Sequence, residues 1–260
     1  VDIIFMNFET FICSSDNTHD VFDLVFLKNS STFSSWKKEI FVGSNVVNNN
    51  SPFVTISAPL LGGWREELLY QITELKKKKS AQYVFLLLDD FYFFEPISYK
   101  AITKHALYTS KNDLDYLRLV KPRRSFLVTL CNIFSLRKQQ YTSLGLNEPY
   151  YTSLQPAIWK IDYLIKLLSS SCNIWEFEHL TYQHSKHAAV TKEFLSFTHL
   201  VEKGRWLPKA FAFIDSSFHK IMHKRGIHQY SFFERPLVTK IKFYIFGYFI
   251  LKCRKYVAGK

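Results

Sequence analysis

Two adjacent carboxylates, Asp89 and Asp90, follow a short apolar run in this sequence. The run Tyr83–Leu88 reads YVFLLL, and an unbroken apolar stretch of this length is typical of a strand covered on both faces. In an open α/β sheet, ligands bind at the carboxyl ends of the strands. Carboxylate oxygens bind Mg²⁺ or Mn²⁺, and the phosphates of a substrate complete the coordination shell. The sequence therefore predicts a divalent-metal site for a phosphate-bearing substrate, with a charged turn as the alternative.

The composition limits the kinds of protein that this chain can be. Its 260 residues, 47% of them hydrophobic, are enough for one large domain with a substantial core. The net charge of +12 favours anionic partners such as nucleotides, acidic lipids or nucleic acid. The four cysteines are far apart, which argues against a zinc site or a disulfide framework and favours a reducing compartment. We expect no signal peptide and no membrane-spanning segment, because the sequence has no apolar run of sufficient length.

Strands and helices alternate in the first part of the chain. The patterns predict strands over residues 1–12, 39–42, 53–56 and 83–88. They predict one helix over residues 21–27, with Asp20 as its N-cap, and a second over 64–78. The second helix has Glu66 and Glu67 in its first turn and a lysine run at its end, which suits the helix dipole. This order predicts an α/β fold with a mostly parallel sheet.

The second part of the chain is less regular. The patterns predict a helix over residues 97–108, strands over 116–120 and 125–134, and a helix that begins at Pro156. In that last helix, Ile158, Ile161, Ile165 and Leu168 form one apolar stripe. No internal repeat and no linker interrupts the chain, so we expect one domain over residues 1–236 and a basic, apolar tail over 237–260.

Several short motifs occur in a familiar order: CSSDN, FVGSN, GGWREELLYQI, YVFLLLDDFYF, YLRLVKP, YYTSLQPAIWKIDYLIKLL, WEFE and EKGRW. From about Ile3 to Trp206, this series resembles a group of bacterial GT-A-type glycosyltransferases of capsule and lipopolysaccharide biosynthesis. The resemblance implies a GT-A-like fold, with a Rossmann-type central sheet flanked by helices. It also implies a nucleotide-sugar donor, UDP-linked, bound by residues 1–96, and a saccharide or lipid-linked acceptor bound by residues 97–236.

The same resemblance suggests roles for residues of the donor half. Asp89 and Asp90 stand where such enzymes keep a DxD-like signature, and both are candidate ligands for Mn²⁺ or Mg²⁺. We favour Asp90 as the metal ligand and Asp89 as a partner for the sugar or ribose. The pair is followed by Phe91 rather than by a third acid, which leaves open which carboxylate binds the metal and whether a metal is required.

Further donor-binding candidates lie in two other motifs. The loop residues Ser14, Ser15 and Asp16 follow the first strand, which in this fold borders the nucleoside. Arg65, at the start of the helix that precedes the acidic strand, is placed to reach a phosphate. Trp64 beside it is a core anchor or a ligand contact.

An inverting sugar transfer needs a carboxylate base that deprotonates the acceptor hydroxyl. Glu178 is our first candidate and Glu176 the second; both belong to the WEFE motif. If this segment is extended, the two side chains point to opposite faces, so one of them faces the pocket. A retaining enzyme would not need this base, and the sequence leaves the stereochemistry open.

The EKGRW motif and two other short segments contain further candidates for substrate contacts. Lys203 and Arg205 are candidates for contacts with the diphosphate, which carries the growing negative charge. For the nearby His199 we prefer a structural or solvated role to metal binding. Gln155 and Tyr151 precede a predicted helix and are candidates for sugar contacts.

The tail bears on where the protein works. Phe243–Leu251 is a run of nine uncharged residues between clustered cations. As a helix it rises about 14 Å, too short for a bilayer, so it is either a buried helix or one that lies in the headgroup region. We favour a cytoplasmic protein that binds peripherally to the anionic inner face of the cell membrane.

Three other kinds of protein compete with this reading. A nucleotidyltransferase shares a similar fold, but its Gly-rich, basic phosphate loop is missing from CSSDN. A nucleic-acid-binding protein is suggested by the charge alone, and no recognisable binding motif supports it. The third is an inactive, transferase-like domain.

Overall fold

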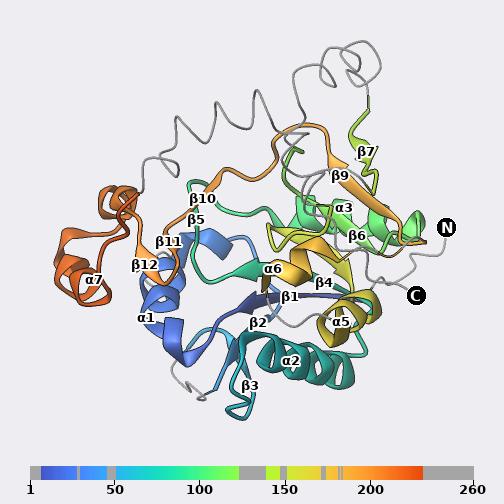
Figure 1. Cartoon of the computed structure of the whole chain (residues 1–260). Helices are drawn as coiled ribbons and strands as arrows, with labels where there is room; N and C mark the ends of the chain where they lie inside the picture. Colours follow the sequence, from blue (N-terminus) through green and yellow to red (C-terminus); the bar gives the residue numbers. More distant parts are fainter. Residues whose placement is uncertain are drawn as a thin grey trace.

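The structure of the chain, a computed structural model, describes residues 7–230 apart from 28–29, 46–50, 123–138, 147–150, 171–173, 181 and 183 (Figure 1). The predicted strand over 125–134 and the tail over 237–260 lie outside the described residues. Among the described helices, none has the length and apolar character needed to cross a membrane.

The architecture is α/β, with a large central sheet as the sequence predicts. In the described part of the chain, eight strands form one sheet in the order β3-β2-β1-β4-β8-β6-β9-β7. Their bounds in that order are Val54–Ser57, Ile40–Ser44, Phe8–Cys13, Tyr83–Leu88, Ala157–Lys160, Tyr116–Arg118, His187–Val190 and Tyr141–Ser143. The strands run parallel except β8 and β7, which are antiparallel to their neighbours.

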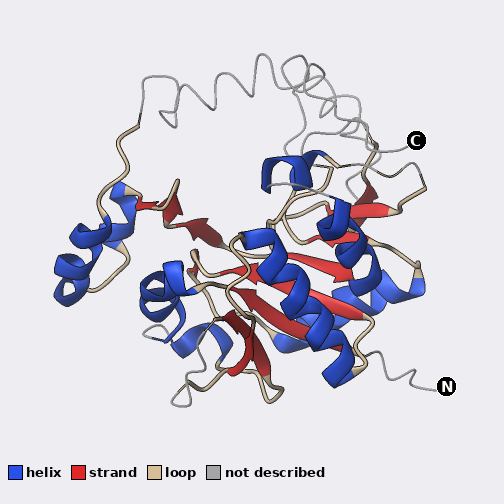
Figure 2. Ribbon diagram, turned by 60° about the horizontal axis from the view of Figure 1, so that its bottom comes forward, coloured by secondary structure: helices blue, strands red, loops and turns tan. Residues whose placement is uncertain are grey.

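Helices lie on both faces of this sheet (Figure 2). Their bounds are His19–Phe22 for α1, Trp64–Lys79 for α2, Tyr99–Lys111 for α3, Ile161–Ser170 for α5, Ile174–His179 for α6 and His219–Arg225 for α7. Side chains of α2, α5 and α6 pack on one face, and those of α1 and α3 on the other. The central strands are therefore buried on both sides, which explains their unbroken apolar sequences.

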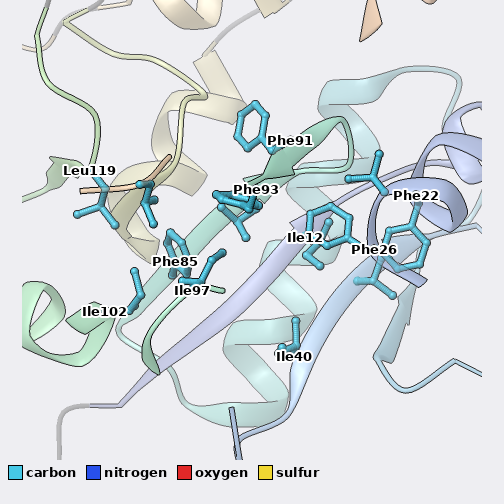
Figure 3. Close-up of a cluster of buried hydrophobic side chains, with 14 of the residues drawn as sticks. Ile12, Phe22, Phe26, Ile40, Phe85, Phe91, Phe93, Ile97, Ile102 and Leu119 are labelled. Atoms are coloured by element: carbon cyan, nitrogen blue, oxygen red, sulfur yellow. The ribbon is translucent and has the colours of Figure 1, made fainter. Parts of the chain in front are cut away.

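The core on the α1 and α3 side shows how the alternation of a strand is used (Figure 3). In β4, Phe85 and Leu87 point into this cluster, whereas Val84 and Leu86 point into the opposite one. Side chains of a strand alternate between faces, so each residue of such a run contributes to a core. Burying one large apolar side chain stabilises the fold by about 1.5–3 kcal/mol.

The predictions for α2 and β4 are confirmed. β4 has the predicted bounds, and α2 carries Glu66 and Glu67 in its first turn and four lysines in its last. Three of these lysines form ion pairs on the surface, as expected of a solvated helix end: Lys76 with Asp162, Lys77 with Glu74, and Lys79 with Glu39.

Two local predictions are wrong. Pro156 does not begin a helix, because Ala157–Lys160 forms β8 between β4 and β6, and α5 begins only at Ile161. Asp20 is not a helix cap, since Thr18 occupies that position and the Asp20 carboxylate instead binds Arg225. In both places a partner from a distant part of the chain decides the local structure.

Two small ribbons bring the last described segment over the end of β4. β5 (Phe91–Phe93) pairs with β10 (Phe197–His199) in antiparallel fashion. β11 (Val201–Glu202) and β12 (Arg205–Trp206) form a hairpin, and α7 follows beside α1 (Figure 1). Residues from both ends of the described chain therefore meet where the acidic pair lies.

Candidate active site

The loop after β1 and the turn after β4 lie side by side. The two strands are parallel, with Cys13 opposite Leu88, so they end at the same edge of the sheet. The amide of Asp89 donates to the carbonyl of Cys13 at 3.1 Å, and the Ser14 hydroxyl donates to the Asp89 carboxylate at 2.8 Å. The structure thus joins two of the predicted donor-site residues, Ser14 and Asp89.

The two carboxylates of the acidic pair have different surroundings. Asp89 is buried, and burial raises its pKa to about 7, although hydrogen bonds from Thr18 and Ser14 act to lower it. Asp90 is half-buried and lies beside a ring from β10, with its Oδ2 atom 3.4 Å from Nδ1 of His199. Asp89 therefore organises the neighbouring loop, whereas Asp90 faces residues from the second ribbon.

Glu178 lies near the same group, within electrostatic range of His199. The WEFE motif is helical, in α6, and the Glu178 carboxylate accepts from the Leu154 amide at 3.4 Å. Burial raises the pKa of Glu178, and the Leu154 amide and the nearby His199 ring act to lower it. His199 is thus close to both Asp90 and Glu178, an arrangement that the sequence did not indicate.

Glu176 lies in the first turn of the same short helix. Two positions along a helix correspond to a rotation of about 200°, so Glu176 and Glu178 point in nearly opposite directions. Of these two predicted base candidates, Glu178 accepts from the Leu154 amide and lies near His199.

The predicted cations lie at two separate places. Lys203 and Arg205 are exposed in the β11–β12 hairpin, whose turn places Lys203 and Gly204 in the left-handed region, at φ of 49° and 75°. Such a two-residue turn is compact and favours glycine at its second position. Arg65, at the start of α2, donates to the neighbouring Glu66 carboxylate at 3.0 Å.

Sequence analysis missed Arg225, the last residue of α7. Its guanidinium makes a two-pronged ion pair with Asp20, with Nε 2.9 Å from Oδ2, and it also donates to the carbonyl of Asn17 at 2.6 Å and of Gly204 at 3.4 Å. Its charge acts to lower the pKa of Asp89. Arg225 therefore connects the loop after β1 to the β11–β12 hairpin.

Lys209 is a second cation that the sequence did not reveal. It follows β12, in the helical turn Pro208–Ala212, and its ammonium donates to the Thr198 hydroxyl. Burial lowers the pKa of Lys209, and the negative charges of Asp90 and Glu202 act in the opposite direction. Lys209 thus supplies positive charge within electrostatic range of Asp90.

A recess opens at the carboxyl ends of β1 and β2 and beside β3, and is contiguous with the acidic turn through Ser14. It is shallow and open to solvent, with a cavity volume of only about 10 Å³, which is room for about one water molecule. It is lined by Ser14, His19, Phe22, Val42, Gly43, Ser44, Ser51 and Thr55. A Cβ atom at Gly43 would lie 2.2 Å from Oε1 of Gln71, so glycine permits the close approach of α2 at this point.

The remaining candidates are placed as follows. Ser15 is half-buried and its amide donates to the Thr18 hydroxyl at 3.2 Å, in the turn that also contains Asp16. Tyr151 is buried and stacked on His187, so it belongs to the core and is not a sugar contact as predicted. Gln155 is half-buried and precedes β8.

The described residues near the acidic turn offer few ligands for a divalent ion. Among the described residues, no group of three or more His, Cys, Asp or Glu side chains could hold a metal. Asp90 and His199 supply one carboxylate oxygen and one ring nitrogen. Mg²⁺ and Mn²⁺ accept such a sparse protein shell when substrate phosphates provide the other ligands.

Comparisons with known proteins give distant similarities. No protein-family model matches the sequence, and neither does any curated protein. Solved structures with a similar fold include residues 1–349 of S. aureus TarS in complex with UDP-GlcNAc, with a TM-score of 0.47, 14% identity, and coverage of 77% of this chain and 60% of that one. The complex of the same S. aureus TarS fragment with UDP has a TM-score of 0.46 and 14% identity, with coverage of 74% of this chain and 60% of that one.

A197 from STIV gives a TM-score of 0.37 and 10% identity, over 76% of this chain and 87% of that one. The chain thus spans 60% of the length of the TarS fragment. These TM-scores and identities are low, so the chemistry of the chain has to be judged from its own residues.

Proposed function

We propose that the chain is a glycosyltransferase that moves a sugar from a UDP-linked donor to a saccharide or lipid-linked acceptor in bacterial surface polysaccharide synthesis. One observation carries the proposal. Ser14 with Asp89, and Asp90 with His199, lie together at the carboxyl ends of β1 and β4, beside a recess and near the half-buried Glu178. The sequence motifs resemble those of GT-A-type glycosyltransferases in the same order, which supports this assignment.

The donor would lie along this edge of the sheet. The nucleoside would lie against the mouth of the recess beside Ser14, which is lined in part by Ser44 and Thr55. The diphosphate would then reach Asp90. Ser15 and Asp16 border the nucleoside, and Arg65, Lys203 and Arg205 are proposed phosphate contacts.

Positive charge near Asp90 would stabilise the UDP leaving group. As UDP departs, negative charge grows on its diphosphate, and fixed cations lower the barrier electrostatically. Lys209 and Arg225 are held near the acidic pair by hydrogen bonds, so their positions are set before the reaction. A Mn²⁺ or Mg²⁺ ion, for which Asp90 and His199 are the proposed ligands, supplies further charge neutralisation when bound.

Glu178 is the proposed base. A carboxylate whose pKa is raised by burial is a stronger proton acceptor than an ordinary one, and the Leu154 amide fixes its orientation. For an inverting transfer, Glu178 would take the proton from the acceptor hydroxyl as the new glycosidic bond forms. Residues 1–96 form the donor half in this proposal, and residues 97–236 the acceptor half.

A thermal-shift panel tests the function. UDP-, GDP-, CMP- and dTDP-sugars are each added with and without Mn²⁺ to wild type, to Asp90→Asn and to Asp162→Asn. Asp162 is a matched surface control, because it lies in the first turn of α5, near the start of β4 and away from the acidic turn, and pairs with Lys76 of α2. We expect stabilisation by a UDP-sugar in wild type and Asp162→Asn, and its loss with normal folding in Asp90→Asn. A wild-type response and turnover in Asp90→Asn would remove the centre of the proposal.

A further inference from the structure

The outer face of the β5–β10 ribbon carries a cluster of partly exposed aromatic rings. Tyr92 and Phe213 are stacked, with ring centroids 5.4 Å apart, and Phe94 meets both rings edge-on, at 5.6 and 5.1 Å. Phe94 is 48% exposed and Phe213 36% exposed, and both lie outside the two core clusters. About half of the described aromatic side chains are buried and several others pack against a core, whereas Phe94 and Phe213 do neither, so their exposure needs a reason other than packing.

The alternation of β5 distinguishes its buried rings from its partly exposed ones, of which Tyr92 also packs against the core at one side. Phe91 and Phe93 point inward and are buried, whereas Tyr92 and Phe94 point to the opposite face. Thr198 pairs directly with Tyr92 across the ribbon, so its hydroxyl lies on the outer face too. The outer face therefore combines flat apolar rings with a hydroxyl.

This face is continuous with the proposed active site. The Lys209 ammonium donates to the Thr198 hydroxyl and lies within electrostatic range of Asp90. Tyr92 is only two residues beyond Asp90, a distance of about 7 Å along a strand. A molecule that rests on the rings would therefore extend directly to the acidic turn.

The chemistry of the surface favours a sugar ring over an acyl chain. A pyranose has an apolar face of C–H groups, which stacks on an aromatic ring, and a rim of hydroxyls, which require hydrogen-bonding groups. Here the rings supply the flat surface, and Lys209 and Thr198 supply polar groups at its edge. An acyl chain would cover this exposed ammonium with hydrocarbon and remove its water, which is unfavourable.

We propose that Tyr92, Phe94 and Phe213 form a subsite for a sugar ring of the acceptor saccharide, with Lys209 and Thr198 bonding its hydroxyls. The inference deepens the proposed glycosyltransferase function and rests on it, because it names the part of the surface that holds the acceptor. The bound ring would stand next to Asp90, on the side of the ribbon opposite the Phe91 side chain.

The test measures saccharide binding directly. Wild type, Phe94→Ala, Phe213→Ala and Tyr70→Ala are applied to an array of immobilised oligosaccharides that contain gluco-, galacto-, manno- and N-acetylated units. Titration calorimetry then gives the Kd for a saccharide that wild type retains. Tyr70 is the matched control, since it is an aromatic residue of α2 that is 39% exposed. We expect about tenfold weaker binding in each Phe variant and no change in Tyr70→Ala.

Three results would overturn the subsite: no saccharide retained by wild type, wild-type affinity in both Phe variants, or loss in the variants of binding to sugar-free phosphatidylglycerol vesicles with saccharide binding intact. If Phe213→Ala fails to fold, the more exposed Phe94 carries the test alone. A thermal shift with UDP-sugars, run on the same samples, separates the two proposals. Saccharide binding without any donor response would keep the subsite and remove the transferase.

Discussion

Replacing Arg225 tests whether the far end of the described chain holds the donor loop in place. Its guanidinium joins Asn17, in the loop after β1, and Asp20, in α1, to Gly204 in the β11–β12 hairpin. Arg225→Ala removes all of these bonds, whereas Arg225→Lys keeps the charge but loses the planar fork that makes the two-pronged pair.

The magnitude follows from the bonds and their exposure. Hydrogen bonds between charged groups contribute about 1.5–3 kcal/mol when they are well buried. The side chain of Arg225 is 17% exposed and that of Asp20 33% exposed, so solvent screening reduces this contribution. We expect Arg225→Ala to lower the free energy of unfolding by about 2 kcal/mol, which corresponds to a fall in Tm of about 4–8 °C.

The assay combines stability with donor kinetics. A double-mutant cycle of Arg225→Ala with Asp20→Asn should give a coupling free energy of about 1–2 kcal/mol. The donor KM should rise about tenfold with a smaller change in kcat, because the loop that Arg225 holds contains Ser14 and borders the recess. Arg225→Lys should recover part of both effects. Lys224→Ala, on the exposed neighbour in α7, is the control and should behave as wild type.

Two outcomes would refute this reasoning. A coupling energy near zero would mean that the ion pair with Asp20 contributes nothing in solution. A lower stability with an unchanged donor KM would mean that Arg225 supports the fold without positioning the donor loop.

Glu178→Gln should reduce kcat by about 10²-fold or more and leave donor affinity intact, with Glu176→Gln near wild type; full kcat in both variants would place the base elsewhere or indicate a retaining enzyme. Burial lowers the pKa of His187 to about 3 and of His105 to about 4, from an ordinary value of 6.5. The unfolded chain therefore binds protons that the fold excludes, so this stability is present above pH 6.5 and falls as the pH drops, by about 2 kcal/mol per histidine between about pH 7 and pH 5. Urea denaturation of wild type and of His187→Gln at several pH values checks this. An equal dependence of the unfolding free energy on pH in the two proteins would contradict it. Deleting residues 237–260 should abolish salt-sensitive binding to anionic vesicles while donor binding persists, and unfolding of the shortened chain would instead make the tail part of the core.

The parts of the fold that the sequence predicted are those with strong local signals. The apolar run of β4 and the charge-polarised pattern of α2, acidic in its first turn and basic in its last, are strong enough locally to predict their conformations. The four residues of β8 have apolar spacing that also suits a helix, and only their pairing with β4 and β6 makes them a strand. α3 begins at Tyr99 rather than at residue 97 because the Ser98 side chain caps it, accepting from the Ala101 amide.

The candidate site divides in the same way. Asp89 and Asp90 were identified because they directly follow the apolar strand. His199, Lys209 and Arg225 gave no comparable signal, since a lone histidine or a surface cation is usually solvated. Their positions depend on the β5–β10 ribbon and on α7, which are set by contacts between residues more than a hundred positions apart.

The separation of these contacts along the chain also bears on the order of assembly. Ser14 and Asp89 are 75 positions apart, whereas Asp90 and His199 are 109 apart and Asp20 and Arg225 are 205 apart. Closing a longer loop costs more chain entropy, and synthesis proceeds from the N-terminus, so the contacts of widest separation form last. A nascent chain on the ribosome therefore has β1 and β4 available for pairing long before α7 exists. The recess is built early, and the residues that complete the site close over it only when synthesis has passed Arg225.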